Sequence, residues 1–113
     1  MRLIAILLAL TILAGCESHR TPPEIAASYL PSQAVALCII GHESGGNPRA
    51  VSATGDYGLA QIHRRTWERT FTRLTGRPWL PAIFDPDLNG IMAREVYREQ
   101  GWRAWSTHRL CGV

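Results

Sequence analysis

The sequence contains no lysine, so arginine supplies all 12 strongly basic side chains, which face nine acidic ones. The resulting formal net charge of +3 is mild; it suits an anionic polymer as a partner but is also common among exported proteins. The sequence also lacks internal repeats, low-complexity segments and a glycine-rich phosphate loop behind a strand. These absences argue against a repeat protein and a nucleotide-binding domain.

No apolar run is long enough for a transmembrane helix. The longest, Leu3 to Ala14, is interrupted only by Thr11 and contains 12 residues, whereas a helix needs about 20 to cross a bilayer. One positive charge, Arg2, precedes the run, and this arrangement is typical of an export signal. Removal of such a signal, and of Arg2 with it, would leave a formal net charge of +2.

The end of this run, Leu13-Ala14-Gly15-Cys16, resembles the lipobox of bacterial lipoproteins. The resemblance implies a lipoprotein signal peptide at residues 1–15, acylation of Cys16, and a mature chain of 98 residues anchored to a membrane by lipid. We expect this chain to face the periplasm or cell wall, from the outer membrane where a cell has one. An ordinary signal peptide with an incidental cysteine is the alternative.

Cysteine is scarce, with three in all, and its placement bounds the folded part. Residues 17–31 are polar and proline-punctuated at first, which predicts a tether behind Cys16, so we assign 16–31 to the lipidated cysteine and tether and 32–113 to one small domain. Small domains often need a covalent staple. Cys38 and Cys111 therefore predict a disulfide in an oxidising compartment, and two free thiols are the alternative.

Capping signals predict a mainly α (α+β) domain. Ser32 is a favoured N-cap for an apolar helix that stops near Gly45, and we expect this helix to be central and buried. Residues 63–74 have helical spacing, and Asp85-Pro86 begins a third helix that ends at Gly101. Residues 47–57 carry turn signals and predict a loop or short β-hairpin.

Glu43 is the first candidate for chemistry, because it lies at the end of the apolar helix, just before two glycines that leave open space. Burial and the negative end of a helix dipole both favour the protonated form of a carboxyl group. A protonated acid can give its proton to a leaving oxygen, which is what cleavage of a glycosidic bond requires.

Four motifs resemble the lysozyme-like superfamily. Residues 43–47, E-S-G-G-N, resemble resuscitation-promoting factors and the E-S motif of soluble lytic transglycosylases, whose G-L-M-Q motif resembles residues 58–61. Residues 56–62 match the D-Y-G-x-x-Q-I of C-type lysozymes. The G-W-x-x-W of residues 101–105, followed by Cys111, resembles the end of resuscitation-promoting factors, in which such a cysteine pairs with one ahead of the catalytic glutamate, as Cys38 stands here.

The resemblance implies a small lysozyme-like fold and cleavage of the β-1,4 bond between N-acetylmuramic acid and N-acetylglucosamine in peptidoglycan. We expect a lytic transglycosylase in which Glu43 acts as general acid and then as base. The presence of Asp56 leaves a second mechanism open, that of a hydrolase with two carboxylates in which Asp56 acts as nucleophile or activates a water. Two departures from the transglycosylase pattern are Ala60 in place of a larger residue and the absence of an A-Y-N-A-G-type motif.

Side chains around the acid are expected to bind the sugar chain. Gln61 can both donate and accept hydrogen bonds, and aromatic rings offer flat apolar faces to sugar rings. Tryptophan in a small domain is at least as often part of the core, and a serine beside a helix end is as often a cap. The candidates for substrate binding are Ser44, Tyr57, Gln61, Trp67, Trp102 and Trp105.

Other functions fit the residues less well. His42-Glu43 does not continue as H-E-x-x-H, because Gly46 stands three residues after Glu43. Cys38 and His42 could bind a metal with His63, His108 or Cys111, but a disulfide explains both cysteines more simply. We therefore expect no metal or organic cofactor, no nucleic-acid partner, and a monomer. A catalytically silent glycan-binding lipoprotein is the rival from another functional class.

Overall fold

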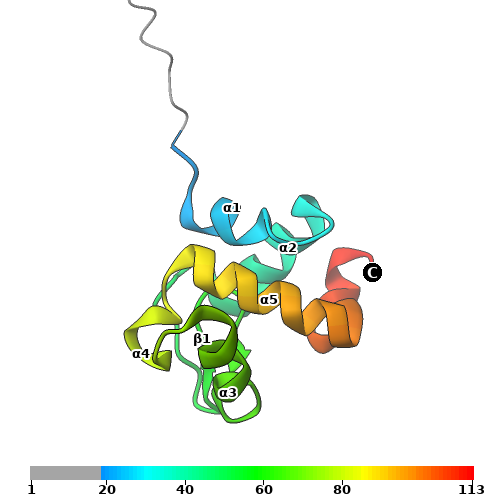
Figure 1. Ribbon diagram of the computed structural model, residues 1–113. Coiled ribbons are helices and arrows are strands. Elements are labelled where there is room, and N and C mark those ends of the chain that lie inside the picture. Colours follow the sequence, from blue (N-terminus) through cyan, green and yellow to red (C-terminus); the bar gives the residue numbers. More distant parts are fainter. Residues whose placement is uncertain (1–18) are drawn as a thin grey trace, which may run out of the picture.

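The computed structural model describes residues 19–113, which form one small, mainly helical body (Figure 1). Cys16 and the expected signal peptide lie outside the described residues, and no helix within 19–113 has the length and apolar character to cross a bilayer. The elements, in chain order, are α1 (Pro22–Ala27), α2 (Gln33–Ser44), β1 (Asp56–Tyr57), β2 (Ile62–His63), α3 (Arg64–Thr75), α4 (Trp79–Ala82), α5 (Pro86–Gln100), and the 3-10 helices η1 (Gly101–Ala104) and η2 (His108–Cys111).

The predicted capping signals are confirmed. The Ser32 hydroxyl accepts a hydrogen bond from the Val35 amide at 3.2 Å at the start of α2, and Gly45 ends this helix in the left-handed conformation at φ 63°. The Asp85 carboxylate accepts from the Leu88 amide at 3.1 Å at the start of α5. The expected hairpin is present but minimal, since β1 and β2 pair antiparallel over two residues each.

The folded domain begins earlier than the predicted boundary at Ser32. Thr21 caps α1 through its side chain, with proline in the first turn, and Ala26 and Ala27 of this helix are completely buried. This segment therefore packs on the domain through Ala26, Ala27 and Leu30, which are buried, and does not form a free tether. Proline at the first helical position is a helix-start signal as well as a linker signal, and here the apolar residues that follow it bury against α5.

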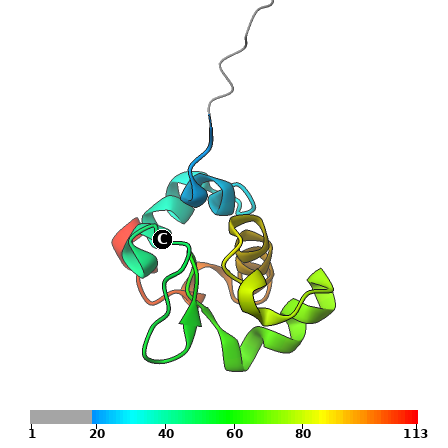
Figure 2. The same cartoon turned by 90° about the vertical axis from the view of Figure 1, so that its left-hand side faces the viewer.

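The helix at the centre of the molecule is α5. In Figure 1 it runs between α1 and α2 above and the hairpin with α3 below, and Figure 2 shows the same order from the side. Its buried side chains include Met92, Ala93 and Val96, whereas α2, the helix expected to be central, leaves Leu37 exposed. A mixed sequence such as α5 can occupy the centre because the charged residues Arg94, Arg98 and Glu99 are exposed, and Asn89 is its only fully buried polar residue.

Gly90 allows α1 and α5 to approach closely. A Cβ atom at this position would lie 2.6 Å from the Tyr29 ring and 2.8 Å from the carbonyl oxygen of Ala26. We therefore expect Gly90→Ala to lower the free energy of unfolding by about 1–3 kcal/mol through overpacking, measured by denaturant titration. Gly41→Ala is the matched control, because a Cβ there meets no atom within 4 Å. Equal stability of the two variants would contradict the packing of α1 on α5.

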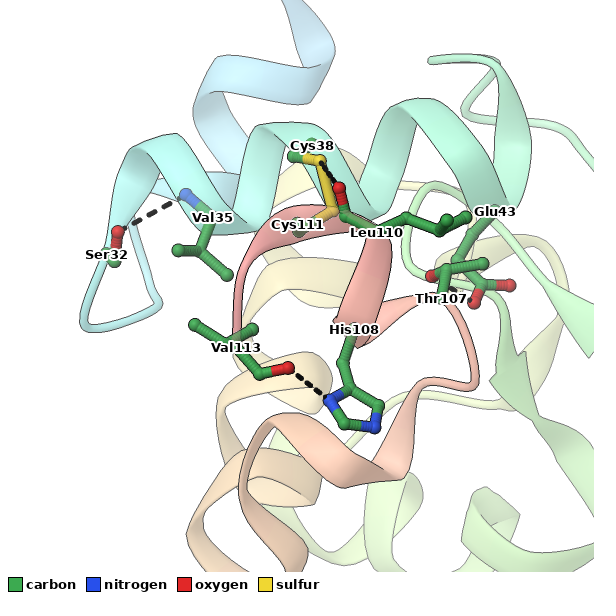
Figure 3. The surroundings of a disulfide bond; sticks show 9 residues. All are labelled: Ser32, Val35, Cys38, Glu43, Thr107, His108, Leu110, Cys111 and Val113. Carbon is green, nitrogen blue, oxygen red and sulfur yellow. Dashed lines mark hydrogen bonds between the residues drawn. A yellow bond between two sulfur atoms is a disulfide. The ribbon is translucent and has the colours of Figure 1, made fainter.

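The C-terminal segment folds back onto α2, where the predicted disulfide joins Cys38 to Cys111 (Figure 3). The Cα atoms of the two cysteines lie 5.8 Å apart, and 73 positions separate them in the sequence. The disulfide prediction is confirmed. It fastens η2 beside α2, the helix whose last turn carries Glu43.

Candidate active site

A groove of about 340 Å³ is lined by side chains from several separate elements, many of them polar. The end of α2, the hairpin and the start of α3 contribute Glu43, Asp56, Gln61, Ile62, His63 and Thr66. The second part of the lining, from α3, α5 and the segment after it, consists of Trp67, Val96, Gln100, Ala104, Trp105 and Ser106. The two carboxylates singled out by the sequence thus line a single groove.

Glu43 occupies the last turn of α2 and is half-buried. Its place in an apolar helix predicts fuller burial. The helix ends directly after Ser44, and Gly45 and Gly46 carry no side chains to cover the carboxyl group. One of its oxygens, Oε1, accepts a hydrogen bond from the Thr107 hydroxyl at 3.0 Å (Figure 3). Glu43 is thus held at one oxygen while its side chain faces the groove.

Asp56 is held by three neighbours. Its Oδ2 atom accepts hydrogen bonds from the hydroxyls of Ser52 and Thr54, each at 2.6 Å, and its Oδ1 atom lies 3.1 Å from Nδ1 of His63. Burial alone would raise the pKa of Asp56 above its ordinary value of 3.8, but the hydrogen bonds from Ser52, Thr54 and His63 outweigh burial, and the net pKa is lowered. Asp56 is therefore a carboxylate at neutral pH.

The lowered pKa of Asp56 makes the stability of the fold depend on pH. Because the carboxyl group titrates at a lower pH in the folded than in the unfolded chain, its contribution to stability is present above its ordinary pKa of 3.8 and is lost as the pH falls through the lowered value. The network is consequently complete over the whole neutral and mildly acidic range.

Gln61 has a strained backbone, with φ at 52°, a conformation that non-glycine residues seldom adopt. Its side-chain amide donates hydrogen bonds to the backbone carbonyls of Ala50, at 3.1 Å, and Gly58, at 2.9 Å. Among residues 19–113 nothing donates to its side-chain oxygen, so this atom can accept a hydrogen bond from a ligand in the groove. Strain of this kind gathers at functional sites.

Asn89 supports the site from behind the groove lining, and the sequence did not reveal it. It is completely buried on α5; its Oδ1 atom accepts from the Ala60 amide at 2.9 Å, and its Nδ2 group donates to the carbonyls of Tyr57 and Ile83 at 3.1 and 3.0 Å. Three backbone groups are thus satisfied by a single side chain. It fixes the hairpin that carries Asp56 on the central helix.

We expect Asn89→Ala to destabilise the domain by about 2–4 kcal/mol, because three buried backbone groups would lose their partner. Thermal unfolding followed by circular dichroism measures this loss. Thr75→Val is a suitable control, since it removes two hydrogen bonds at the far end of α3, one to the Phe71 carbonyl and one from the Arg77 amide. A loss for Asn89→Ala no larger than that of the control would show that water replaces the asparagine.

The aromatic candidates divide between groove and core. Trp67 and Trp105 both line the groove although they are only 7% and 5% exposed, and Nε1 of Trp105 donates to the Ala60 carbonyl at 2.8 Å. Tyr57 lies outside the groove lining and packs edge-on against Trp79. Trp102 also lies outside it, packed on Tyr97 beside a second hollow of about 700 Å³.

Ser44 also lies outside the groove lining. Its hydroxyl donates to the Ile40 carbonyl at 3.0 Å and accepts from the Gly46 amide at 3.2 Å, so it closes the end of α2. Of the predicted site residues, the groove thus brings together Glu43, Asp56, Gln61, Trp67 and Trp105.

Several polar groove residues carried no signal in the sequence as ligand contacts. Thr66, Gln100 and Ser106 line the groove from three separate segments, and Thr107, next to Ser106, bonds Glu43. No spacing rule links residues so far apart, and isolated serines, threonines and glutamines are ordinary surface residues. His63 was considered only as a metal ligand, whereas the structure pairs it with Asp56.

One cluster among the described residues has the spacing of a metal site. The ligand atoms of Cys38, His42 and Cys111 lie within 4.8 Å of one another. The two sulfur atoms are bonded to each other, however, and a disulfide does not supply the thiolates that a metal prefers. In this form the cluster does not fit a metal ion.

Comparison with known proteins relates this arrangement to a family. A family model described as the transglycosylase SLT domain matches residues 23–100, from α1 to the end of α5. The chain is similar to lysozyme P of Drosophila melanogaster, with 28% identity over 130 aligned positions that cover 98% of this chain and 92% of the relative. It is also similar to lysozyme 2 of Lucilia sericata, with 32% identity over 87 positions, 66% of this chain and 60% of the relative. Residues 101–113, which carry Thr107 and Cys111, lie outside the family match.

Proposed function

The chain belongs to the transglycosylase SLT domain family, and from this premise we propose that it is a lytic transglycosylase that cleaves the β-1,4 bond between N-acetylmuramic acid and N-acetylglucosamine in peptidoglycan. The single observation that carries the proposal is the shared groove of Glu43 and Asp56. The groove is lined by the Glu43 carboxyl group, whose second oxygen makes no hydrogen bond within residues 19–113, and by Asp56, which is ionised at neutral pH.

Glu43 acts twice in the proposed reaction. As an acid, it gives its proton to the bridging oxygen, and the bond from that oxygen to C1 of the muramic acid breaks with its electron pair on the departing glucosamine. The positive charge left at C1 is then captured by the C6 hydroxyl of the same sugar. The hydroxyl proton passes to the Glu43 carboxylate, so that an anhydro sugar forms, no water is consumed and the acid is restored.

Asp56 is proposed to stabilise the positive charge that develops on the sugar. A fixed anion in a groove favours an oxocarbenium-like transition state without any change in its own protonation. Both oxygens of Asp56 already accept hydrogen bonds, from Ser52, Thr54 and His63, and these bonds reduce the nucleophilicity of the carboxylate. This geometry favours electrostatic assistance by Asp56 over covalent attack.

A peptidoglycan hydrolase of the lysozyme type is the second candidate. It is favoured by the D-Y-G-x-x-Q-I segment at residues 56–62 and by the two lysozymes to which the chain is similar. In this reaction a water, in place of the C6 hydroxyl, supplies the oxygen to C1, and Asp56 is the group placed to assist it. Lipid attachment at Cys16 would hold either enzyme near its substrate.

Mass spectrometry of the products tests the proposal. Purified peptidoglycan sacculi are incubated with the protein, and the soluble fragments are examined for their chain ends. Anhydro-muramyl ends support the transglycosylase, and reducing muramyl ends in their place would support the hydrolase. Binding to sacculi without any released fragment would instead support the silent glycan-binding protein and refute both enzymes.

A further inference from the structure

The C-terminal segment reaches Glu43 through Thr107. We propose that Thr107 is a positioning residue for Glu43 and that the Cys38–Cys111 disulfide keeps it in place, so that catalysis depends on the redox state of this disulfide. The inference rests on the proposed role of Glu43. It goes beyond the family, because residues 101–113 lie outside the family match.

The contact joins two parts of the chain that are 64 positions apart. Thr107 lies between η1 and η2, and its hydroxyl is 3.0 Å from Oε1 of Glu43; both residues are half-buried. Within residues 19–113 no other group makes a hydrogen bond to the Glu43 carboxylate. Figure 3 shows the two side chains pointing toward each other from α2 and the C-terminal segment.

The chemistry of a hydroxyl group suits this role. Thr107 can donate to the ionised carboxylate, and it can accept from the carboxylic acid, because a hydroxyl has one donor and two acceptor sites. It therefore remains a partner of Glu43 through both steps of the reaction. With Oε1 held, the second oxygen is the one left to exchange a proton with the sugar. Displacement of a reacting group by about 1 Å can cost on the order of 100-fold in rate.

Two anchors hold Thr107 in the segment. Trp105, two residues earlier, is buried and bonded to the Ala60 carbonyl. Cys111, four residues later, is joined to Cys38, which lies on the same helix as Glu43 and five residues before it. The disulfide and the Thr107–Glu43 bond thus link the same two segments. Reduction of the disulfide by a dithiol removes one of the two anchors.

The test compares Thr107→Val, which keeps the shape of the side chain, with Thr107→Ser, which keeps the hydroxyl. Release of soluble fragments from sacculi gives kcat and KM. We expect Thr107→Val to lower kcat about 10- to 100-fold with KM unchanged, and Thr107→Ser to stay within about threefold of the wild type. Thr75→Val is the matched control, because it removes a hydroxyl far from the groove.

Unchanged kcat in Thr107→Val, or an equal loss in Thr107→Ser, would overturn the positioning role. A fall in activity explained by a lower melting temperature would also count against it. The double variant Cys38→Ala/Cys111→Ala, assayed where circular dichroism shows it folded, tests the anchor. If the disulfide acts through Thr107, the variant that combines all three substitutions loses less kcat, relative to the wild type, than the product of the two separate losses. A combined loss equal to that product would refute the proposal that the disulfide acts by keeping Thr107 in place.

A measurement without turnover separates this inference from the proposed function. In protein labelled with ¹³C at the glutamate carboxyl carbon, the Glu43 signal is assigned with Glu43→Gln. Its chemical shift is expected to move in Thr107→Val and to stay in Thr107→Ser. A wild-type protein that releases no fragments refutes the enzyme while this shift still reports the contact. If the wild type is active but the Glu43 signal is the same in both Thr107 variants as in the wild type, the contact alone is refuted.

Discussion

Glu43→Gln is expected to lower the rate of fragment release from sacculi by about 10³-fold, within the range that general acid–base catalysis contributes. Glutamine has nearly the shape of glutamate and can still accept the hydrogen bond from Thr107 through its side-chain oxygen, but it has no acidic proton to give to the bridging oxygen. The variant should therefore fold normally and fail in the chemical step. Fragment release over time, followed by chromatography, measures the loss.

Binding provides the control for this variant. Because the groove and its other lining residues are unchanged, Glu43→Gln should sediment with sacculi as the wild type does. Glu24→Gln removes a glutamate in the first turn of α1, away from the groove lining, and should retain full activity. Wild-type rates of release in Glu43→Gln would remove Glu43 from the mechanism and with it the proposed reaction.

The helix boundaries could be predicted because their signals are local. Ser32 and Asp85 each bond an amide three residues ahead, and Gly45 and Gly101 each adopt a positive φ at the helix end. Such chemistry depends on a few neighbouring residues and hardly on the rest of the fold. The start of the domain was missed because the burial of α1 depends on Gly90, 60 or more positions away.

The site was predictable only in part, for a similar reason. Motifs placed Glu43, Asp56 and Gln61 in one groove because these residues stand close together in the sequence. Composition alone could not decide whether Trp102 faces a ligand or packs on a neighbour, since an aromatic ring serves either purpose. The roles of Asn89 and Thr107 could not be predicted, because their hydrogen-bond partners are 29 and 64 positions away in the sequence.

Asn89 and Thr107 both act on segments that the motifs identified. Asn89 holds the hairpin of Asp56 through the Tyr57 carbonyl, and Thr107 bonds the carboxylate of Glu43. The two carboxyl groups of the groove are thus positioned by different parts of the molecule. The proposed role of the disulfide would couple stability at the C-terminal end to the geometry at Glu43.

Replacement of both cysteines, Cys38→Ala/Cys111→Ala, is expected to destabilise the domain by about 4 kcal/mol, because the disulfide closes a loop of 73 positions and so restricts the unfolded chain. For a domain of this size, that loss corresponds to a fall in melting temperature of more than about 15 °C. Differential scanning calorimetry of the oxidised wild type, the reduced wild type and the double variant measures it. Reduction should lower the melting temperature of the wild type to near that of the variant and leave the variant unchanged. Equal melting temperatures for all three would show that the packing of η2 on α2 holds the C-terminal segment without the covalent bond.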